Sequence, residues 1–542
     1  MPSPSPFVCS ACRQSARILR TSNAFSKRRY TRPTFAPKPT LDLKHIRQNP
    51  GLYKQNCLDR NYAPYAENGW RILELHEQVV AQQREAVELR RRNNVLGREL
   101  KKSDGGDHRA RMLEEARALK GKLAEFEGRE KLAQDEMEKL ALELPNLSSQ
   151  HTPVGSEPAV LGHINGNTPP TGKGNRSHVD IGRSLDLLDF EASATTSGWG
   201  FYFLKNEAAL LEQALIQFSL SVALAQGWKI LTPPSLIYSH IASATGFLPR
   251  DQNGETQIYA LAQPQNQTQD AKASAAGLVL AGTAEIPFAG SQANKTLLST
   301  SLPLKVIGPS RCYRAEAGAR GMDTKGLYRV HEFTKVEMFA WTSPPSTSRQ
   351  TPSALDSDFE GGFEGGFDTA EDAGGAESQA DVVFEEMISI QTEILTSLGL
   401  HARVLEMPTT DLGASATRKI DIEAYFPSRT AIDDGYGEVT SASICTDYQA
   451  RRLNTKVKFA DNGGARSEDP TEERGGANRG GIRRGGGTAF AHTVNGTAMA
   501  IPRILAALLE NGWDEVSGTV VVPGVLRKWM PGGLGRIGGG RV

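Results

Sequence analysis

The sequence predicts an α+β protein in which a long helical hairpin precedes a domain of interleaved strands and helices. Three observations support this fold class. From residue 70 to 144, Leu, Val and Ala recur at steps of three and four among charged residues, which is the helical period. The run SDGGD at 103–107 interrupts that pattern near its middle. From about residue 176, helical and strand patterns alternate to the C-terminus.

The segment 41–150 is expected to form one helical domain. Residues 41–65 read as a short amphipathic lead-in, and Pro145-Asn146 ends the domain. Two runs of nearly equal length around one turn predict an antiparallel coiled-coil hairpin. Each arm has about 35 residues and, at ~1.5 Å per residue, should reach roughly 50 Å.

The charge of the hairpin is unevenly distributed. Residues 84–122 hold twelve Lys or Arg and seven acids, whereas the flanks 70–83 and 123–145 hold four and nine. A solvated helix surface would explain this, and so would an RNA-binding tip that contacts phosphates. The candidate contacts are Arg90, Arg91, Arg92, Lys101, Lys102, Arg109 and Arg111.

The N-terminus is basic. Residues 1–41 contain eight Lys or Arg and no acid, and the segment is rich in Arg and Ser. This composition predicts a mitochondrial transit peptide over residues 1–40 and location in the matrix; a basic RNA-contacting tail is the alternative. Removing residues 1–30 leaves 62 − 6 = 56 basic groups against 62 acids, a net charge of −6. Any nucleic-acid contact must therefore come from a local patch.

Composition excludes several other classes. Five scattered cysteines are too few for a disulfide framework, and the pair Cys9 and Cys12 lacks the further ligands of a zinc site. No apolar run approaching the ~20 residues of a membrane span is evident, so no membrane partner is expected.

Three segments of the larger domain read as irregular. A Gly-, Pro- and Thr-rich linker is expected at 151–175, before a domain of interleaved strands and helices at 176–542. Residues 343–381 carry nine acids and one Arg, and residues 462–488 carry nine glycines in 27. Such compositions bury too little apolar surface to offset ordering entropy, so both are predicted to be disordered insertions.

The stretch 312–342 carries the chemistry. Two strands are expected there, with side chains alternating between faces. One face would hold Arg314, Glu316, Arg329, His331, Phe333, Lys335 and Glu337, and the other Val330, Val336 and Met338. Arginines can bind phosphate, a ring can stack on a base, and carboxylates can bind amino groups. The pattern suggests a nucleotide site, although exposed strands also alternate in this way.

Several separated motifs share one resemblance. LDLKHIRQNP opens at residue 41, TAEIP lies at 283–287, RAEAGARGMDTKGLYRVHEFTKVE at 314–337 and EVTSAS at 438–443. TVNGTAMAIPRILAALLENG follows at 493–512 and VPGVLRKWM at 522–530. Residues 41–530 thus resemble seryl-tRNA synthetases of the bacterial and organellar type. The resemblance implies a class II catalytic domain, an antiparallel sheet flanked by helices.

The resemblance also implies site residues. Arg314 and Arg503 would bind ATP phosphates, Glu316 the adenine amino group and Phe333 the adenine ring. Glu438 would act with both arginines as a catalytic group, and with Ser441 would hold Mg²⁺. The remaining ATP contacts would be Ala315, Val330, His331, Glu332, Val439 and Thr440. The serine pocket would comprise Thr283, Ala284, Glu285, Glu337 and Thr497.

The implied reaction joins L-serine to ATP as seryl-adenylate and then transfers serine to the 3′ end of mitochondrial tRNA-Ser. No side-chain nucleophile is required, so Cys312 and His331 read as strand residues. The hairpin would grip the long variable arm of tRNA-Ser. Segment 205–234, with Leu210, Leu211, Ala214, Leu215 and Phe218, would form a homodimer interface or an ordinary core helix.

Three positions depart from the family pattern: Ile444 replaces Asn, and Ala498 and Pro502 replace Gly. Pro502 suits the first turn of a helix. The enzymatic alternatives are a class II ligase for another small amino acid and one that loads a carrier protein. A catalytically silent paralogue that binds RNA or a partner synthetase is the other alternative. It would be expected to lose Arg314, Glu316, Glu337 or Arg503, and all four are present.

Overall fold

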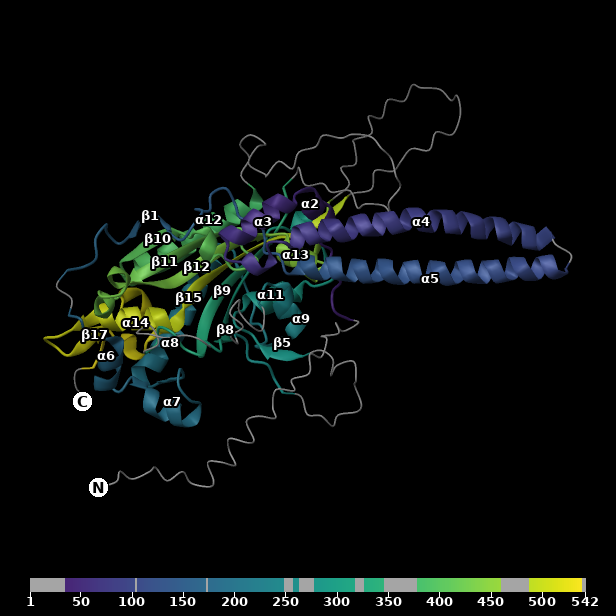
Figure 1. The fold of residues 1–542 in the computed structure, drawn as a ribbon. Helices are drawn as coiled ribbons and strands as arrows, with labels where there is room; N and C mark the ends of the chain where they lie inside the picture. The colour runs from purple at the N-terminus through teal and green to yellow at the C-terminus, as the bar shows by residue number, and fades with distance from the viewer. Residues whose placement is uncertain are drawn as a thin grey trace, which may run out of the picture.

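The computed structural model describes residues 35–102, 105–171, 174–247, 257–262, 277–316, 326–345, 378–459 and 487–538 (Figure 1). Most of the predicted transit peptide and of both predicted insertions lies outside the described residues, as do Cys9 and Cys12.

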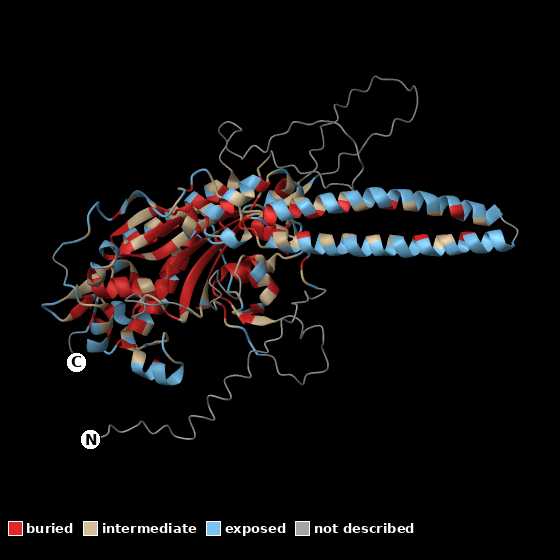
Figure 2. Cartoon of the chain, in the orientation of Figure 1, coloured by how far each residue is buried: buried red, intermediate tan, exposed pale blue. Residues whose placement is uncertain are grey.

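The predicted hairpin is confirmed. After α2 (Leu43–Gln48) and α3 (Pro50–Asp59), helices α4 (Asn68–Lys102) and α5 (Asp107–Leu142) run side by side away from the body (Figure 1). Most of their surface is exposed, with a thin buried seam between them (Figure 2). Leu96, Met112 and Leu119 form that seam near the tip. The positive φ of Gly105 and Gly106 suits the turn, because glycine adopts it without steric cost.

The root of the hairpin is fixed to the body by buried polar contacts. The Arg60 guanidinium donates to the carbonyl oxygens of Asn146 and Gly413. The Asn146 amide donates to the carbonyl oxygens of Ser415 and Cys445, both at 2.9 Å. Four backbone carbonyls are thereby satisfied between segments distant in sequence, which orients the hairpin relative to the body.

An eight-stranded sheet forms the body, in the order β1-β10-β11-β12-β15-β9-β8-β4. Neighbouring strands are antiparallel except for β4 on β8. The strands are β1 (Ala159–Ile164), β4 (Lys229–Ile230), β8 (Leu304–Tyr313), β9 (Glu332–Thr342), β10 (Ala402–Glu406), β11 (Arg418–Tyr425), β12 (Tyr436–Thr446) and β15 (His492–Ala500). The predicted α+β class with a mainly antiparallel sheet is confirmed. Strand β1 lies inside the segment expected to be a linker.

Helices cover both faces of the sheet. On one face, α8 (Asn206–Ala225), α12 (Gln379–Leu398) and α14 (Ile501–Gly512) pack in one apolar cluster with Val336 and Met338 of β9. On the other, α11 (Glu285–Ser291) and α13 (Tyr448–Leu453) pack with Phe339 and Trp341. The period of two expected for β9 therefore separates its residues between two layers.

Smaller elements connect these layers: α6 (His178–Ser184), β2 (Leu188–Asp189), α7 (Phe190–Thr196), β3 (Phe203–Leu204), β5 (Leu236–Tyr238), α9 (Ser239–Ala244), β6 (Leu278–Leu280), β7 (Thr296–Leu298), β13 (Lys456–Lys458), β14 (Thr488–Phe490), β16 (Trp513–Asp514), β17 (Thr519–Val521) and β18 (Arg536–Ile537).

Helix α8 qualifies one expectation from composition. By length and apolar content it could cross a membrane, with a mean hydropathy of 1.5 in its most apolar window. That window is 61% buried inside the protein, against the sheet and its neighbouring helices. Burial of this kind is typical of a core helix.

Candidate active site

Strands β8 and β9 bring the predicted nucleotide-binding residues together at one end of the sheet. Their pairing ends at Tyr313 and Glu332. Arg314 and Glu316 lie just beyond β8, and Arg329 and His331 lie just before β9, so the expectation that all four are strand residues is wrong. The backbone of Glu316, with φ of +46°, cannot continue a strand.

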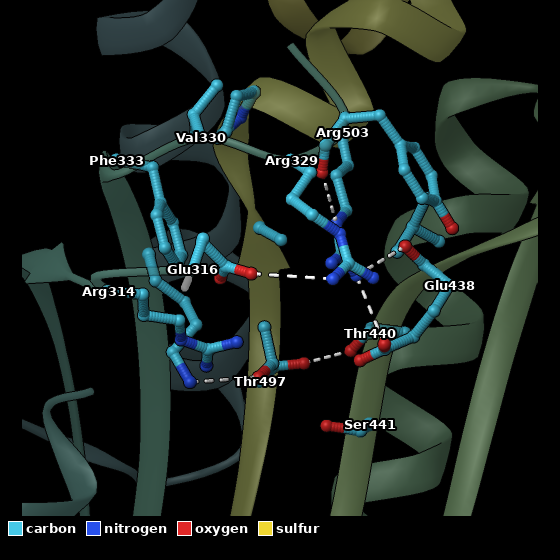
Figure 3. A pocket seen from close by; sticks show the side chains of 15 residues that line it. Arg314, Glu316, Arg329, Val330, Phe333, Glu438, Thr440, Ser441, Thr497 and Arg503 are labelled. Atoms are coloured by element: carbon cyan, nitrogen blue, oxygen red, sulfur yellow. Dashed lines mark hydrogen bonds and ion pairs between the residues drawn. The ribbon is translucent and has the colours of Figure 1, made fainter. Parts of the chain in front are cut away.

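A cavity with about 530 Å³ of empty space, part of it open to solvent, lies where these segments meet β12, β15 and the start of α14 (Figure 3). Its lining combines cations, carboxylates, hydroxyls and rings. The lining residues are Arg314, Glu316, Tyr328, Arg329, Val330, Phe333, Lys335, Glu438, Val439, Thr440, Ser441, Thr497, Ala500, Pro502 and Arg503.

Three of the residues expected to contact ATP lie outside this lining. The Ala315 N–H donates to the Gln257 carbonyl at 3.1 Å, and Glu332 pairs with Tyr313 at the strand end. The His331 ring stacks on Phe201 at 5.5 Å, and its Nδ1 lies 2.9 Å from the Arg314 carbonyl oxygen. His331 therefore supports the backbone beside Arg314 from outside both the strand and the cavity.

The arginines at the cavity are held in distinct ways. Arg503 donates from Nε to the Tyr328 carbonyl at 3.1 Å and from Nη1 to the Glu438 carbonyl at 2.9 Å. Arg314 donates to the Gly282 carbonyl at 3.4 Å, and its guanidinium carbon lies 5.4 Å from the Phe333 ring centre. Both guanidinium groups therefore lie at the same cavity, as an anion site requires.

The carboxylates at the cavity pair with these cations. Glu438 Oε2 lies 3.1 Å from Arg503 Nη1, and Glu316 Oε2 lies 3.5 Å from Arg329 Nη1. Burial opposes ionisation of Glu438, but Arg503, Lys419 and Arg314 outweigh it and lower its pKa to about 2. Glu438 is therefore a carboxylate across the physiological range.

Of the residues expected to bind serine, the four polar ones belong to a buried polar cluster next to the cavity: Thr283, Glu285, Glu337 and Thr497. The Glu285 carboxylate accepts from Gln449 Nε2 at 2.6 Å and from Asn495 Nδ2 at 3.2 Å. Lys335 Nζ lies 2.5 Å from Glu337 Oε2 and 3.4 Å from Thr497 Oγ1. Because Thr497 and Lys335 also line the cavity, the cluster is continuous with it.

Glu285 is poised between two protonation states. Burial raises its pKa, the nearby Glu337 raises it further, and Lys335 and Gln449 lower it, so that it lies at about 7. A cationic ligand would favour the ionised form. The neighbouring Thr283 accepts from the Glu285 N–H at 3.3 Å, whereas Ala284 packs into the apolar cluster beneath.

Several residues that complete this site had no role predicted from the sequence. Tyr328 places its carbonyl against Arg503, and Gln449 and Asn495 hold Glu285. Asn495 could have been found, since Thr493, Asn495 and Thr497 alternate along β15. Gln449 gives no such signal, because α13 is far from Glu285 in sequence.

The donor set at Glu438 and Ser441 is compatible with Mg²⁺. Mg²⁺ usually binds one or two carboxylates together with substrate phosphates and water rather than a cage of protein ligands. Both residues line the cavity, and Glu438 is ionised. Among the described residues, no cluster of three or more His, Cys, Asp or Glu suited to a metal is found.

The basic residues predicted at the hairpin tip are exposed, but they are not equivalent. Arg92 donates from Nε to Glu115 at 2.7 Å and so links α4 to α5. Arg90, Arg91, Lys101, Lys102, Arg109 and Arg111 are also exposed on the two helices around the turn.

The three departures from the family pattern lie in different places. Ile444 and Ala498 are buried in the apolar cluster on the α14 face of the sheet. Pro502 is in the first turn of α14 and lines the cavity, as expected of a proline at a helix start. Of the three, only Pro502 borders the cavity.

Comparison with known proteins gives the class of the fold and site. Residues 271–360 match the tRNA synthetase class II core domain (G, H, P, S and T), and residues 40–148 match the seryl-tRNA synthetase N-terminal domain. The molecule is therefore a class II aminoacyl-tRNA synthetase. The solved seryl-tRNA synthetase of Pyrococcus horikoshii, complexed with ATP, superposes with a TM-score of 0.72 at 28% identity, covering 93% of this chain and all of the other.

Relatives that align over nearly the whole chain identify the family within this class. A serine–tRNA ligase of Rubrobacter xylanophilus is 35% identical over 90% of this chain and 96% of its own length. The mitochondrial serine–tRNA ligase of Saccharomyces cerevisiae is 35% identical over 95% of this chain and 99% of its own length. The chain belongs to the seryl-tRNA synthetase family. Similarity over both domains to ligases supports a catalytic function and does not support a silent paralogue.

Proposed function

We propose that this chain activates L-serine with ATP to seryl-adenylate and pyrophosphate, and then transfers serine to the 3′ end of tRNA-Ser. The observation that carries the proposal is one cavity lined by Arg314, Arg503 and Glu438 and continuous with a buried cluster around Glu285 and Glu337. The cationic part suits a triphosphate, and the small acidic part suits an ammonium group with a hydroxyl.

In the first step, the serine carboxylate oxygen forms a bond to the α-phosphorus while the bond from that phosphorus to the bridging oxygen breaks. Negative charge gathers on the non-bridging oxygens and on the departing pyrophosphate. Arg314 and Arg503 stabilise this charge more in the transition state than in the ground state. Phe333 would stack on adenine and Glu316 would accept from its amino group.

Mg²⁺ would be held by Glu438 and Ser441 and would neutralise phosphate charge. The Arg503 guanidinium contacts both the carbonyl and the carboxylate of Glu438, so this ion pair is oriented before ATP arrives. Pre-orientation of this kind lowers the reorganisation needed at the reacting phosphate.

Selectivity for serine would come from the buried cluster. Glu285 or Glu337 would bind the ammonium group, and Thr283 and Thr497 would leave little room around the hydroxyl. A site that pairs a buried hydroxyl rejects an analogue lacking it by about 10⁴-fold or more, because its own polar groups are left unpaired. Threonine would be refused for lack of space for its methyl group.

The hairpin would bind the RNA, with residues 41–150 as the tRNA-binding domain and 176–542 as the catalytic domain. The exposed cations near the turn of α4 and α5 would contact phosphates of the variable arm. Transfer of serine from the adenylate then depends mainly on the placement of the terminal ribose hydroxyl.

A homodimer and a mitochondrial location complete the proposal. Exposed apolar side chains gather along the chain from α7 to β5, among them Phe203, Leu210, Leu224 and Ile230. Such a group suits a subunit interface. The acid-free N-terminus favours import into the matrix, although bacterial relatives are as similar as mitochondrial ones.

The test is serine-dependent ATP–pyrophosphate exchange by the chain purified from about residue 31, compared with threonine, alanine and glycine. Exchange with serine alone is expected. Exchange with another amino acid, or with none, would overturn the proposal. Aminoacylation of mitochondrial and cytosolic tRNA-Ser then identifies the RNA substrate.

A further inference from the structure

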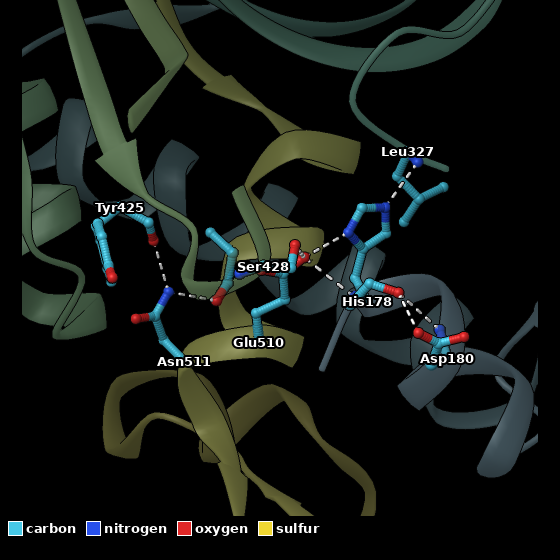
Figure 4. A network of polar contacts seen from close by, with 9 residues as sticks. His178, Asp180, Leu327, Tyr425, Ser428, Glu510 and Asn511 are labelled. Carbon is cyan, nitrogen blue, oxygen red and sulfur yellow. Dashed lines mark hydrogen bonds and ion pairs between the residues drawn. The ribbon is translucent and has the colours of Figure 1, made fainter. Parts of the chain in front are cut away.

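Helix α14 connects the cavity at its first turn to a buried polar network at its last (Figure 4). Glu510, in that last turn, is only 2% exposed. A carboxylate there faces the negative end of the helix dipole and is also desolvated, so it requires compensating donors.

Glu510 receives four hydrogen bonds from two other segments. Its Oε1 accepts from the His178 N–H at 3.0 Å, His178 Nδ1 at 2.7 Å and Ser428 Oγ at 2.9 Å. Its Oε2 accepts from the Ser428 N–H at 3.1 Å. Glu510 thereby holds the start of α6 and the turn at 427–429 against α14.

Both nitrogens of the His178 ring form hydrogen bonds. Nδ1 faces the Glu510 carboxylate and therefore donates, while Nε2 accepts from the Leu327 N–H at 3.0 Å. A neutral imidazole with its proton on Nδ1 satisfies both partners. Gly326, with φ of +73°, packs so closely that an added Cβ would lie 2.2 Å from His178 Nε2.

Both segments held by Glu510 contact Tyr328 or the residue before it. Tyr328 follows Leu327, and its carbonyl accepts from Arg503 Nε at 3.1 Å. Its ring centre lies 4.8 Å from the Arg503 guanidinium carbon and 4.1 Å from that of Arg429, the residue after Ser428. The ring therefore lies between two cations whose positions depend on the same network.

We propose that His178 is a positioning residue of the ATP site. Through its hydrogen bond to the Leu327 N–H it fixes the backbone that presents Tyr328 to Arg503, and so aligns the Arg503 guanidinium with the phosphates. His178 does not line the cavity and touches no reacting group. This inference rests on the proposed function, because it assigns the same cavity to ATP.

Two substitutions separate the roles of the ring nitrogens. His178→Asn can keep a donor near the place of Nδ1 but offers Leu327 no acceptor; His178→Gln can place an oxygen near Nε2. In pyrophosphate exchange, His178→Asn should raise KM for ATP about tenfold, the effect of one lost hydrogen bond. KM for serine should stay within about twofold, and His178→Gln should restore most of the ATP affinity.

His45→Asn is the matched control, since His45 is 8% exposed compared with 7% for His178 and lies in α2. It should lower Tm without changing KM for ATP. Unchanged KM for ATP in His178→Asn, equal rises for ATP and serine, or equal impairment of both His178 variants would overturn the inference.

Gly326→Ala provides the test if His178→Asn does not fold. Its methyl group would press on the His178 ring and so separate Nε2 from the Leu327 N–H while leaving every donor present. KM for ATP should again rise about tenfold. An unchanged KM would contradict the proposal.

Wild-type protein without serine-dependent exchange would overturn the proposed function instead. ATP binding by equilibrium dialysis would then test His178 alone, with weaker binding expected in His178→Asn and unchanged binding counting against it.

Discussion

Lys335 and Glu337, two positions apart on β9, form a buried ion pair whose Nζ–Oε2 distance is 2.5 Å. Their side chains are 8% and 1% exposed, so neither charge is solvated by bulk water. Since alternate residues share a strand face, the pair lies on the side of β9 away from Val336 and Met338. The cluster expected to bind serine thus contains its own countercharge.

Lys335→Met should destabilise the protein by about 3–5 kcal/mol, because it leaves Glu337 buried without its cation. The double variant Lys335→Met/Glu337→Gln should recover part of that loss. Calorimetric Tm values and urea denaturation measure both. Arg71→Met breaks the exposed pair with Glu74 and should cost no more than about 1 kcal/mol; an equal cost at the two sites would contradict the role of burial.

Arg503→Lys should lower kcat for pyrophosphate exchange about 10²-fold. A single ammonium cannot bond the Tyr328 carbonyl and Glu438 together while facing a phosphate. Arg418→Lys is the control, because Arg418 is also largely buried and bonded to Glu406 but does not line the cavity. Comparable loss in both variants would argue for general disruption.

The serine affinity should depend on pH through Glu285. With its pKa at about 7, the Glu285 carboxyl is mostly protonated at pH 6 and mostly ionised at pH 8. KM for serine should therefore decrease as the pH rises from 6 to 8. Glu285→Gln should raise KM and flatten this profile. A profile that persists in Glu285→Gln would assign the titration to another group.

The same pKa has a consequence for stability. Because burial raises it above the ordinary value of 4.5, the folded protein holds a proton that the unfolded chain releases. Stability without ligand should therefore decline as pH rises from 4.5 through about 7, and Glu285→Gln should remove this contribution. Tm measured across this range, with and without serine, tests the sign.

Charge reversal at the hairpin tip should separate the two steps. Arg91→Glu with Lys101→Glu should raise KM for tRNA about tenfold or more and increase its sensitivity to salt, because phosphate contacts are lost. Pyrophosphate exchange should be unchanged. Lys131→Glu, exposed on α5 nearer the root, is the matched control. Parallel losses in both assays would defeat the assignment of the tip to RNA binding.

Leu210→Glu should shift the protein from dimer to monomer in sedimentation equilibrium. Leu210 is 41% exposed on α8, in the segment that also exposes Phe203 and Leu224, and a buried charge at an interface is costly. Leu132→Glu, at a residue 71% exposed on α5, should leave the dimer intact. A wild-type monomer would refute the proposed interface directly.

Periodicity and turn chemistry were enough to predict the hairpin, because each helix is encoded by apolar residues three and four positions apart and the turn is marked by two glycines. Alternation also placed Phe333, Lys335 and Glu337 on one face of β9. The motif residues Arg314 and Arg503 were identified through the resemblance, and the structure places them at the same cavity. Their joint placement depends on strand order, which periodicity does not encode.

What could not be predicted depends on distant pairings. Glu510 and His178 are 332 residues apart, and neither differs in its local pattern from an ordinary helix-end residue. Glu285 and Gln449 meet across 164 residues. The strand prediction also failed at Glu316, since a positive φ at a non-glycine residue has no reliable local signature.

The buried root of the hairpin determines how freely the arm can move. Arg60 and Asn146 bond to the backbone at Gly413, Ser415 and Cys445, so swinging the arm would strip several carbonyl groups of their donors at once. The arm should therefore keep a fixed distance between its tip and the body. An RNA whose two contact points are spaced differently would then bind poorly because of its shape, even if it carried every correct base.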